Sequence, residues 1–397
     1  MKLSLHIGTT KTGTTSCQQW FAENREILRE QGVIYPITLG DVNHRSLMIY
    51  ARDTNKPDKS FARRKIKTSA DHKAFREKLR NRFAAEIEQH KAARHWVISN
   101  EHLHSKITTL AMIRRVKAFL EPHFESITVY LHLRPQVDLL VSGASQRARL
   151  GQIVSLKTLT RPSVSENSAY FNYEQIADRW SRVFGRENLH LVPFRKFPNI
   201  AEYLAGEIGI ERDKTSVIPH HNEALDWRSM GLVNALGQGG AELGHLGKAL
   251  FLDQLPMSEK LQIGEDLARQ IQSRFTNSNT RLAALHPEIT LDDLTPEWAR
   301  YDAEPNVCKL EDTCEFSEPL VYLIKHYRQE LRLERGRALL VEAELAIISQ
   351  KEAAQEKLSQ ATTALQFRHC LPELQERRKK LQTRRDGLQG RITGPPV

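Results

Sequence analysis

Short apolar runs alternate with longer amphipathic segments along the first half of the chain. Four runs have the length and aliphatic content of buried strands; they span residues 3–7, 95–99, 127–133 and 189–193. The segments between them carry apolar positions at helical spacing; these span residues 16–31, 72–92, 110–120, 136–150 and 173–184. Strands that alternate with helices are typical of a parallel sheet flanked by helices. We therefore expect an α/β fold whose ligands bind at the carboxyl ends of the strands.

Two segments interrupt this alternation. Residues 52–68 are basic, polar and poor in aliphatic side chains, and we expect an inserted, mobile loop over the ligand site. Residues 152–172 are rich in Ser and Thr without a periodic pattern, which predicts a second loop near the site. The pattern becomes helical again over 222–287 and irregular over 288–313.

Beyond Pro319 the pattern changes to heptad-like steps, which favours an α-helical extension. The apolar positions of these steps are Ile324, Leu331, Ala338, Val341, Leu345, Ile348, Leu358, Leu365, Leu374, Leu381 and Leu388. We predict one long helix with a second one, or a kinked pair, over 313–397, and an α/β domain over 1–312. Two interpretations stay open: a solvated helical hairpin on the α/β domain, or self-association through a partly heptad-patterned coiled-coil seam.

Composition narrows the class of protein. The 397 residues are 40% hydrophobic and 27% charged, as in globular proteins. No stretch approaches the roughly 20 apolar residues of a transmembrane helix, and the first residues do not read as a signal peptide. We expect a cytoplasmic protein, with a peripheral position at the inner membrane surface left open. The widely spaced Cys17, Cys308, Cys314 and Cys370 are expected to be free thiols, without a zinc site.

The net charge of +10 favours acidic partners. A polyanionic cofactor and an acidic glycan both fit this charge. No nucleic-acid-binding module accompanies it, so nucleic acid is not an expected partner.

The residues after the first strand have the composition of an anion-binding loop. They comprise Gly8, Thr9, Thr10, Lys11, Thr12, Gly13, Thr14, Thr15 and Ser16. A strand, a Gly-rich loop and a helix N-terminus together hold phosphate, since glycines allow close approach and the first helical N–H groups are unpaired. The loop differs from the nucleoside-triphosphate loop, because Thr14 stands where that motif has its lysine and the lysine is at Lys11. A small-molecule kinase on a similar scaffold is the alternative enzyme. A kinase would need a lysine at position 14, and this chain has none there.

The run Lys11-Thr-Gly-Thr-Thr-Ser16 resembles the 5′-phosphosulfate-binding loop of sulfotransferases that use 3′-phosphoadenosine-5′-phosphosulfate (PAPS). A second element supports the resemblance: Arg134 ends a strand and Ser142 follows eight residues later. This spacing is similar to the 3′-phosphate-binding element of that family, with Ser145 as another donor. The resemblance covers about residues 1–300 and implies a P-loop-type sheet. The Arg-Lys-Gly element that closes the nucleotide pocket in aryl members has no clear counterpart.

Transfer of a sulfuryl group to an alcohol needs a base. Glu101 and His102 follow the strand at 95–99, and the resemblance implies Glu101 as base with His102 second. His44 lies in a patch that similar enzymes use near the acceptor. The implied reaction is an in-line displacement without a metal, in which Lys11 and the loop N–H groups stabilise the leaving phosphate.

The acceptor is expected to be a hydroxyl of a glycan or lipid-linked sugar; a small metabolite and a tyrosine stay open. Besides the kinase, the alternative to this function is a non-catalytic nucleotide-binding assembly protein.

Overall fold

The computed structural model describes residues 1–55, 57, 59–218, 224–238, 259–310, 317–348, 353–366, 370 and 372–393. The chain divides into two compact units. The α/β unit contains Met1–Arg147, Val154–Trp227 and Leu255–Cys308. The helical unit contains Ala148–Ile153, Arg228–Gln254 and Lys309–Val397, and so takes in two segments that precede residue 313.

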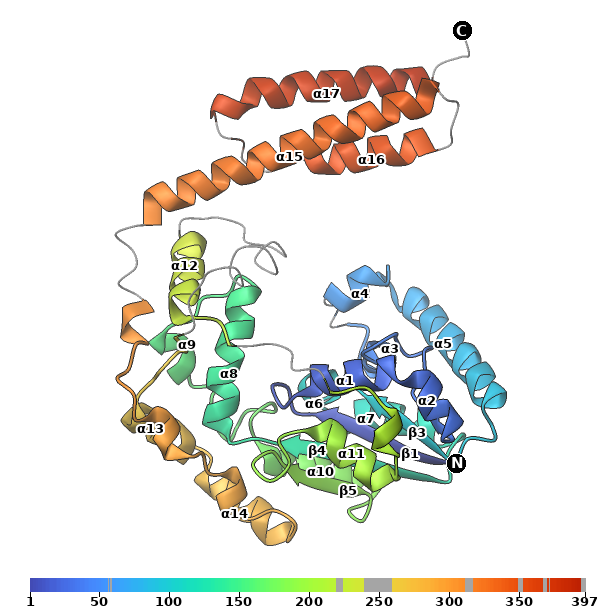
Figure 1. Ribbon diagram of the computed structural model, residues 1–397, viewed down its shortest axis with the longest axis vertical. Helices are drawn as coiled ribbons and strands as arrows, with labels where there is room; N and C mark the ends of the chain where they lie inside the picture. The colour runs from blue at the N-terminus through green and yellow to red at the C-terminus, as the bar shows by residue number, and fades with distance from the viewer. Residues whose placement is uncertain are drawn as a thin grey trace. The chain divides into compact units, whose positions relative to one another are not determined.

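A parallel five-stranded sheet forms the centre of the α/β unit, in the order β2-β3-β1-β4-β5 (Figure 1). Its strands are β1 (Lys2–Gly8), β2 (Val33–Ile34), β3 (His95–Ser99), β4 (Ser126–Leu133) and β5 (Leu189–Pro193). The predicted α/β class and all four predicted strands are confirmed. Strand β2 was not predicted because two residues carry no periodic pattern.

Helices alternate with these strands along the chain and continue beyond them; the helix that begins at Trp227 lies in the helical unit from Arg228 on. In chain order they are α1 (Thr14–Glu23), α2 (Arg25–Glu30), α3 (Arg45–Ala51), α4 (Lys59–Arg63), α5 (Ser69–Gln89), α6 (His102–Lys106), α7 (Leu110–Leu120), α8 (Gln136–Arg149), α9 (Leu156–Thr160), α10 (Tyr173–Phe184), α11 (Ile200–Ile208), α12 (Trp227–Gln238), α13 (Glu265–Ser273) and α14 (Thr276–Leu285). Short 3₁₀ turns at Arg212–Lys214, Asp292–Leu294, Trp298–Tyr301 and Cys308–Leu310 complete the described secondary structure before residue 311.

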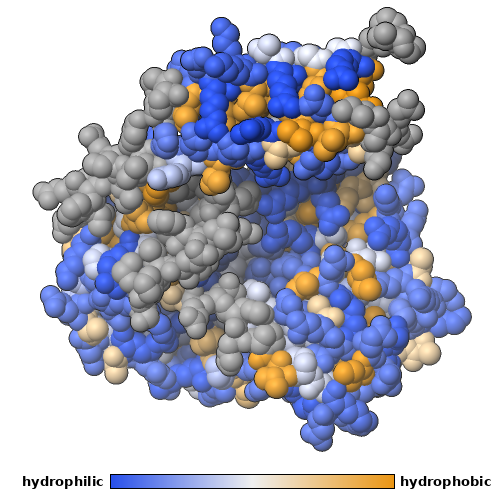
Figure 2. Space-filling model, turned by 45° about the horizontal axis from the view of Figure 1, so that its top comes forward, coloured by the Kyte–Doolittle hydropathy of each residue, from blue (hydrophilic) through white to orange (hydrophobic). Residues whose placement is uncertain are grey.

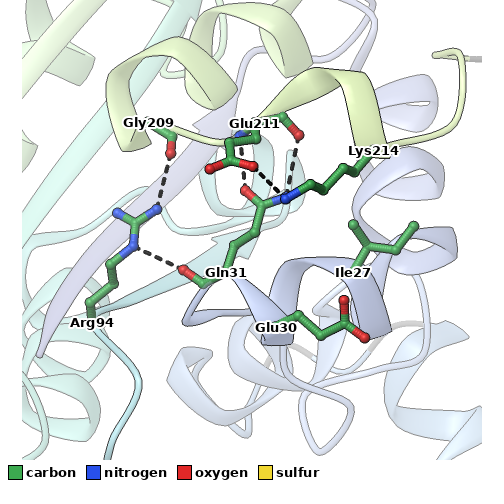
Figure 3. Close-up of a pocket in the computed structure, with 7 residues that line it drawn as sticks. All are labelled: Ile27, Glu30, Gln31, Arg94, Gly209, Glu211 and Lys214. Carbon is green, nitrogen blue, oxygen red and sulfur yellow. Dashed lines mark hydrogen bonds and ion pairs between the residues drawn. The ribbon is translucent and has the colours of Figure 1, made fainter.

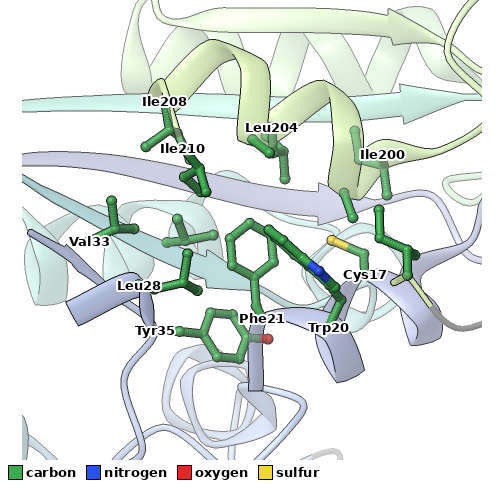
Figure 4. Packing of buried hydrophobic residues seen from close by; sticks show 14 of the residues in the cluster. Cys17, Trp20, Phe21, Leu28, Val33, Tyr35, Ile200, Leu204, Ile208 and Ile210 are labelled. Atoms are coloured by element: carbon green, nitrogen blue, oxygen red, sulfur yellow. The ribbon is translucent and has the colours of Figure 1, made fainter. Parts of the chain in front are cut away.

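Both faces of the sheet are buried. One face packs on a cluster that α1, α2 and α11 supply, with Trp20, Phe21 and Leu204 fully buried (Figure 4). Successive side chains of a strand point to opposite faces, so Val97 joins this cluster while its neighbour Trp96 packs edge-on against Phe83 of α5 on the other face. The burial of both faces explains why the strands are continuous apolar runs.

Three connections differ from the predictions. The loop expected over 152–172 contains the short helix α9, whose Leu159 is buried. The helix expected over 16–31 is two helices, because Asn24 interrupts it and its side chain donates to the Trp20 carbonyl and to Ser216 Oγ. The loop expected over 52–68 contains α4, whose Phe61 is buried with the Arg52 guanidinium 5.3 Å from its ring centre. This segment is therefore anchored by an apolar side chain that its basic composition concealed.

The C-terminal part of the helical unit is built from three helices, α15 (Ser317–Ile348), α16 (Ala353–Leu365) and α17 (Pro372–Thr393). Each contacts the other two around buried Leu340, Leu358 and Leu388. Gly336 permits close approach of α15 to α16, since a Cβ there would lie 2.7 Å from Leu365 Cδ2. The predicted helical extension is confirmed, but the expected pair of helices is wrong. No helix of the described residues is long and apolar enough to cross a membrane.

Candidate functional site

The loop after β1 leaves a helix N-terminus open. Gly8, Lys11 and Gly13 all have positive φ, at 93°, 64° and 77°. Two hydrogen bonds hold the turn in place. The Thr9 N–H donates to the His132 carbonyl, and Thr12 Oγ1 donates to the Thr9 carbonyl. Gly13 precedes α1 and supplies no side-chain cap.

The N–H groups of Gly13, Thr14 and Thr15 have no hydrogen-bond partner in the described part of the chain. Such unpaired N–H groups and the positive end of the helix dipole attract anions. Gly13 and Thr15 are exposed, Thr10, Lys11 and Ser16 are half-buried, and Thr9, Thr12 and Thr14 are buried. The buried threonines therefore hold the shape of the loop, and the exposed and half-buried residues are the ones that a ligand can reach.

Glu101 lies directly against this loop. A Cβ at Gly8 would be 3.0 Å from Glu101 Cβ. The Glu101 Oε2 accepts hydrogen bonds from Gln18 Nε2 at 2.7 Å and from Asn43 Nδ2 at 2.8 Å. Two amide donors from different elements thus fix the carboxylate, which is 16% exposed and so remains in reach of solvent.

His102 joins the same group through its Nε2. That nitrogen lies 3.5 Å from Glu101 Oε1 and 2.6 Å from Arg45 Nη2. Because the guanidinium can only donate, His102 Nε2 accepts from Arg45. This nitrogen of His102 is therefore already engaged with Arg45, and the choice between Glu101 and His102 as base stays a prediction.

His44 is not a surface residue. It is fully buried, its Nε2 donates to the Pro36 carbonyl, and its Nδ1 accepts from the Ser99 N–H. Burial lowers its pKa to about 3. Both ring nitrogens are used by the backbone, so the expected contact with an acceptor is not supported. The residue instead fastens the 36–44 segment, and with it Asn43, to the carboxyl end of β3.

The Arg134 side chain contacts the backbone of the loop. Its Nη1 donates to the Lys11 carbonyl at 3.0 Å, and its guanidinium lies 5.0 Å from the Phe194 ring centre. Burial lowers the pKa of Arg134, and Asp138, 3.6 Å from Nε, opposes this. Arg134 is therefore engaged with the loop backbone and with Asp138, and its expected contact with a 3′-phosphate stays a prediction.

Two serines on α8 were candidate donors. Ser142 is half-buried. Ser145 is buried and accepts from the Leu225 N–H.

Residues without a motif complete the surroundings of the loop. Tyr170 Oη hydrogen-bonds Thr10 Oγ1, and the Tyr170 carbonyl contacts His104 Nε2 at 3.0 Å. The Nε and Nη2 atoms of Arg147 are buried and have no hydrogen-bond partner among the described residues. Burial, followed by the charge of Arg161, lowers the pKa of Arg147, and Tyr170 raises it. A buried guanidinium without a counter-ion is costly, and an anion would relieve that cost.

A polar pocket elsewhere in the α/β unit does not add to this site. Figure 3 shows that most of the polar and charged groups that border it interact with one another, while Ile27 and Glu30 complete the lining. Arg94 donates to the carbonyls of Gln31 and Gly209, and Lys214 is paired with Glu211 at 2.7 Å. We assign it no function.

Comparisons with known proteins leave the family open. No family model and no curated protein matches the chain. A solved sulfotransferase structure from Alicyclobacillus acidocaldarius is similar with a TM-score of 0.42 and 13% identity, over 74% of this chain and 98% of that chain. Similarity at this level establishes neither family nor activity, so function has to be argued from the site.

Proposed function

We propose that the chain is a sulfotransferase that moves a sulfuryl group from PAPS to a hydroxyl of an acceptor. The observation that carries the proposal is the contact between Gly8 and Glu101. A carboxylate held by Gln18 and Asn43 thus lies against the first residue of the loop. That loop leads to the uncapped N-terminus of α1, which suits an anion. Proton acceptance and anion binding are the two tasks that this reaction needs in one place.

The proposed ligand, PAPS, carries two anionic groups. The N–H groups of Gly13, Thr14 and Thr15 and the hydroxyls of Thr15 and Ser16 would hold the 5′-phosphosulfate. Arg134 adds positive potential behind the loop, and Ser142 would donate to the 3′-phosphate. When bound, PAPS supplies a sulfuryl group already activated on a phosphate.

Glu101 would take the proton of the attacking hydroxyl as the new oxygen–sulfur bond forms. The bond from sulfur to the 5′-phosphate oxygen breaks at the same time, and its electron pair leaves with the nucleotide. Lys11 and the loop N–H groups would stabilise the charge that develops on that phosphate. Gln18 and Asn43 act through Glu101, because their amides keep its carboxylate in one place.

The acceptor is proposed to be an acidic glycan or lipid-linked sugar. Arg147 supports this choice, since its Nε and Nη2 are buried without a hydrogen-bond partner among the described residues. Its charge interacts with Tyr170, which bonds Thr10 of the loop. The net charge of +10 is consistent with such an acceptor.

Transfer of labelled sulfate from PAPS into polysaccharide, lipid and small-molecule fractions of cell extracts tests the proposal. The native chain should label one fraction, and the Glu101→Gln variant should label none above background. Absence of label in every fraction with the native chain, at PAPS concentrations that saturate it, would contradict the proposed reaction.

A further inference from the structure

Helix α15 carries two apolar faces, and the three-helix core covers one of them. Leu333, Leu340 and Ala343 are buried against α16 and α17. Large apolar side chains on another face remain exposed: Tyr327 is 65% exposed, Leu331 70% and Leu345 60%. Figure 2 shows hydrophobic residues at the surface of the helical unit among charged ones.

The exposed face has the spacing of a helix–helix seam. We call it the outer stripe, and it consists of Ile324, Tyr327, Leu331, Ala338, Val341 and Leu345. These positions are separated by alternating steps of three and four residues, with Glu334 at the single position that breaks the series. A narrow stripe with two apolar positions per heptad is the signature of a coiled-coil seam. Three heptads are at the short end of what such a seam needs.

The charges beside the outer stripe distinguish between occupants. Arg335 and Arg337 flank its middle and are exposed, with no ion-pair partner in the described part of the chain. Two turns further on, the flanks carry Glu342 and Glu344. Both are partly exposed carboxylates, and they pair with Lys357 and Arg384 of the same chain. Positive charges therefore precede negative ones along a single helix, and this order is complementary to itself when a second helix runs in the opposite direction.

We propose that the C-terminal part of the outer stripe, from Leu331 to Leu345, binds the same part of a second copy of this chain, with the two α15 helices antiparallel. Ala338 then packs on Val341 of the second copy, Arg335 faces its Glu342, and Arg337 faces its Glu344. The parallel arrangement places Glu334 opposite the same residue of the second copy, inside the seam, where like charges repel. In the antiparallel one Glu334 faces Leu345 instead, and its carboxylate stays paired with Arg377 of α17.

The oligomeric state of the full chain tests this proposal, independently of any activity. Light scattering after size exclusion should give twice the 45.5 kDa of one chain, falling toward one chain on dilution. The double variant Leu331→Glu, Leu345→Glu should remain at one chain at every concentration with unchanged helix content, because both side chains lie outside the core. Leu285→Glu, at a 49% exposed leucine of α14, is the matched control and should not change the mass.

Single cysteines test the orientation, in a background where Cys308, Cys314 and Cys370 are serine. With a short bis-maleimide, Ala338→Cys should cross-link to itself while Leu331→Cys should not, since only residue 338 lies near the two-fold axis of an antiparallel pair. Equal cross-linking of both variants would overturn the antiparallel arrangement. A native chain that remains at the mass of one chain throughout would overturn the proposal itself, including the case in which the outer stripe packs on another part of the same chain.

Discussion

Gly8 and Glu101 are in van der Waals contact across the carboxyl ends of β1 and β3, so closely that a Cβ at position 8 would lie 3.0 Å from Glu101 Cβ. The anion-binding loop and the candidate base are thus fixed relative to one another. Gly8 also has φ 93°, a conformation that residues with a Cβ rarely adopt. One glycine therefore permits both the turn of the loop and the approach of the carboxylate.

Gly8→Ala should displace Glu101 and strain the loop. We expect a loss of stability of about 1–3 kcal/mol from the positive φ and the crowding together, with sulfuryl transfer reduced more than the folded fraction. Gly206→Ala is the matched control, because a Cβ at this helical position meets nothing within 4 Å and replacing a helical glycine stabilises by about 0.5–1 kcal/mol. Urea unfolding and transfer assays measure both effects. Equal stability of the two variants would contradict this role of Gly8.

Glu101→Gln should remove the base and keep the shape of the site. Loss of a general base lowers turnover by about 10²- to 10⁴-fold, while the affinity for 3′-phosphoadenosine-5′-phosphate should stay within about threefold because the loop is untouched. Single-turnover transfer and calorimetry separate the two quantities. Glu26→Gln on α2, at a 74% exposed carboxylate, is the control. Turnover near the native rate in Glu101→Gln would assign the proton to another group.

Lys11→Met should lower turnover much more than nucleotide affinity. The lysine is proposed to stabilise charge that develops only as the phosphate leaves, and such interactions contribute about 10²- to 10³-fold to rate. Methionine keeps an unbranched stem, so the positive-φ turn at position 11 should survive. The measurement is the ratio of the loss in turnover to the loss in affinity. If the two losses are equal, Lys11 serves binding alone.

Four buried histidines should make the fold sensitive to acid. Burial lowers the pKa of His6 and His44 to about 3 and that of His104 and His132 to about 4. The unfolded chain takes up these protons near the ordinary value of 6.5, whereas the folded chain does so only near 3–4. Stability is therefore complete above pH 6.5 and is lost as the pH falls toward 4, by at most about 1.4 kcal/mol per pH unit for each group.

The variant His44→Gln tests this linkage. It should be less stable at pH 7, because the hydrogen bonds of His44 to the backbone are lost, and its stability should fall less steeply with acid. His190→Gln, at a half-buried position of β5, serves as the control. Urea midpoints at pH 7, 5.5 and 4.5 give the slopes. If stability falls equally steeply with acid in the native chain and in His44→Gln, His44 does not contribute to the acid sensitivity.

The sequence predicted those parts of the fold that depend on neighbouring residues in the chain. The four longer strands and the helices α7 and α10 follow from continuous or periodic apolar positions, and the loop follows from its glycines and hydroxyls. The roles of Gln18, Asn43 and Arg147 could not be predicted, because each depends on a neighbour from a distant segment and no spacing marks it. His44 shows the reverse case, in which a polar residue in a polar segment is buried by backbone groups that satisfy its ring.

The heptad pattern of α15 marks an exposed face of the helix and not its core face. Leu331, Val341 and Leu345 stood out in the sequence, yet the core of the helical unit uses Leu333, Leu340 and Ala343. Helix α15 is apolar on two faces. The heptad repeat that is easiest to see in the sequence lies on the exposed face, so the sequence alone could not say which face contacts α16 and α17.

Calorimetric titration with 3′-phosphoadenosine-5′-phosphate and, separately, with ATP–Mg²⁺ distinguishes a phosphosulfate-binding loop from a nucleoside-triphosphate loop. The doubly phosphorylated nucleotide should bind at least about tenfold more tightly than ATP–Mg²⁺, a difference of about 1.4 kcal/mol, and Thr15→Val should weaken its binding. Equal or tighter binding of ATP–Mg²⁺ would contradict the assignment of this loop to a phosphosulfate.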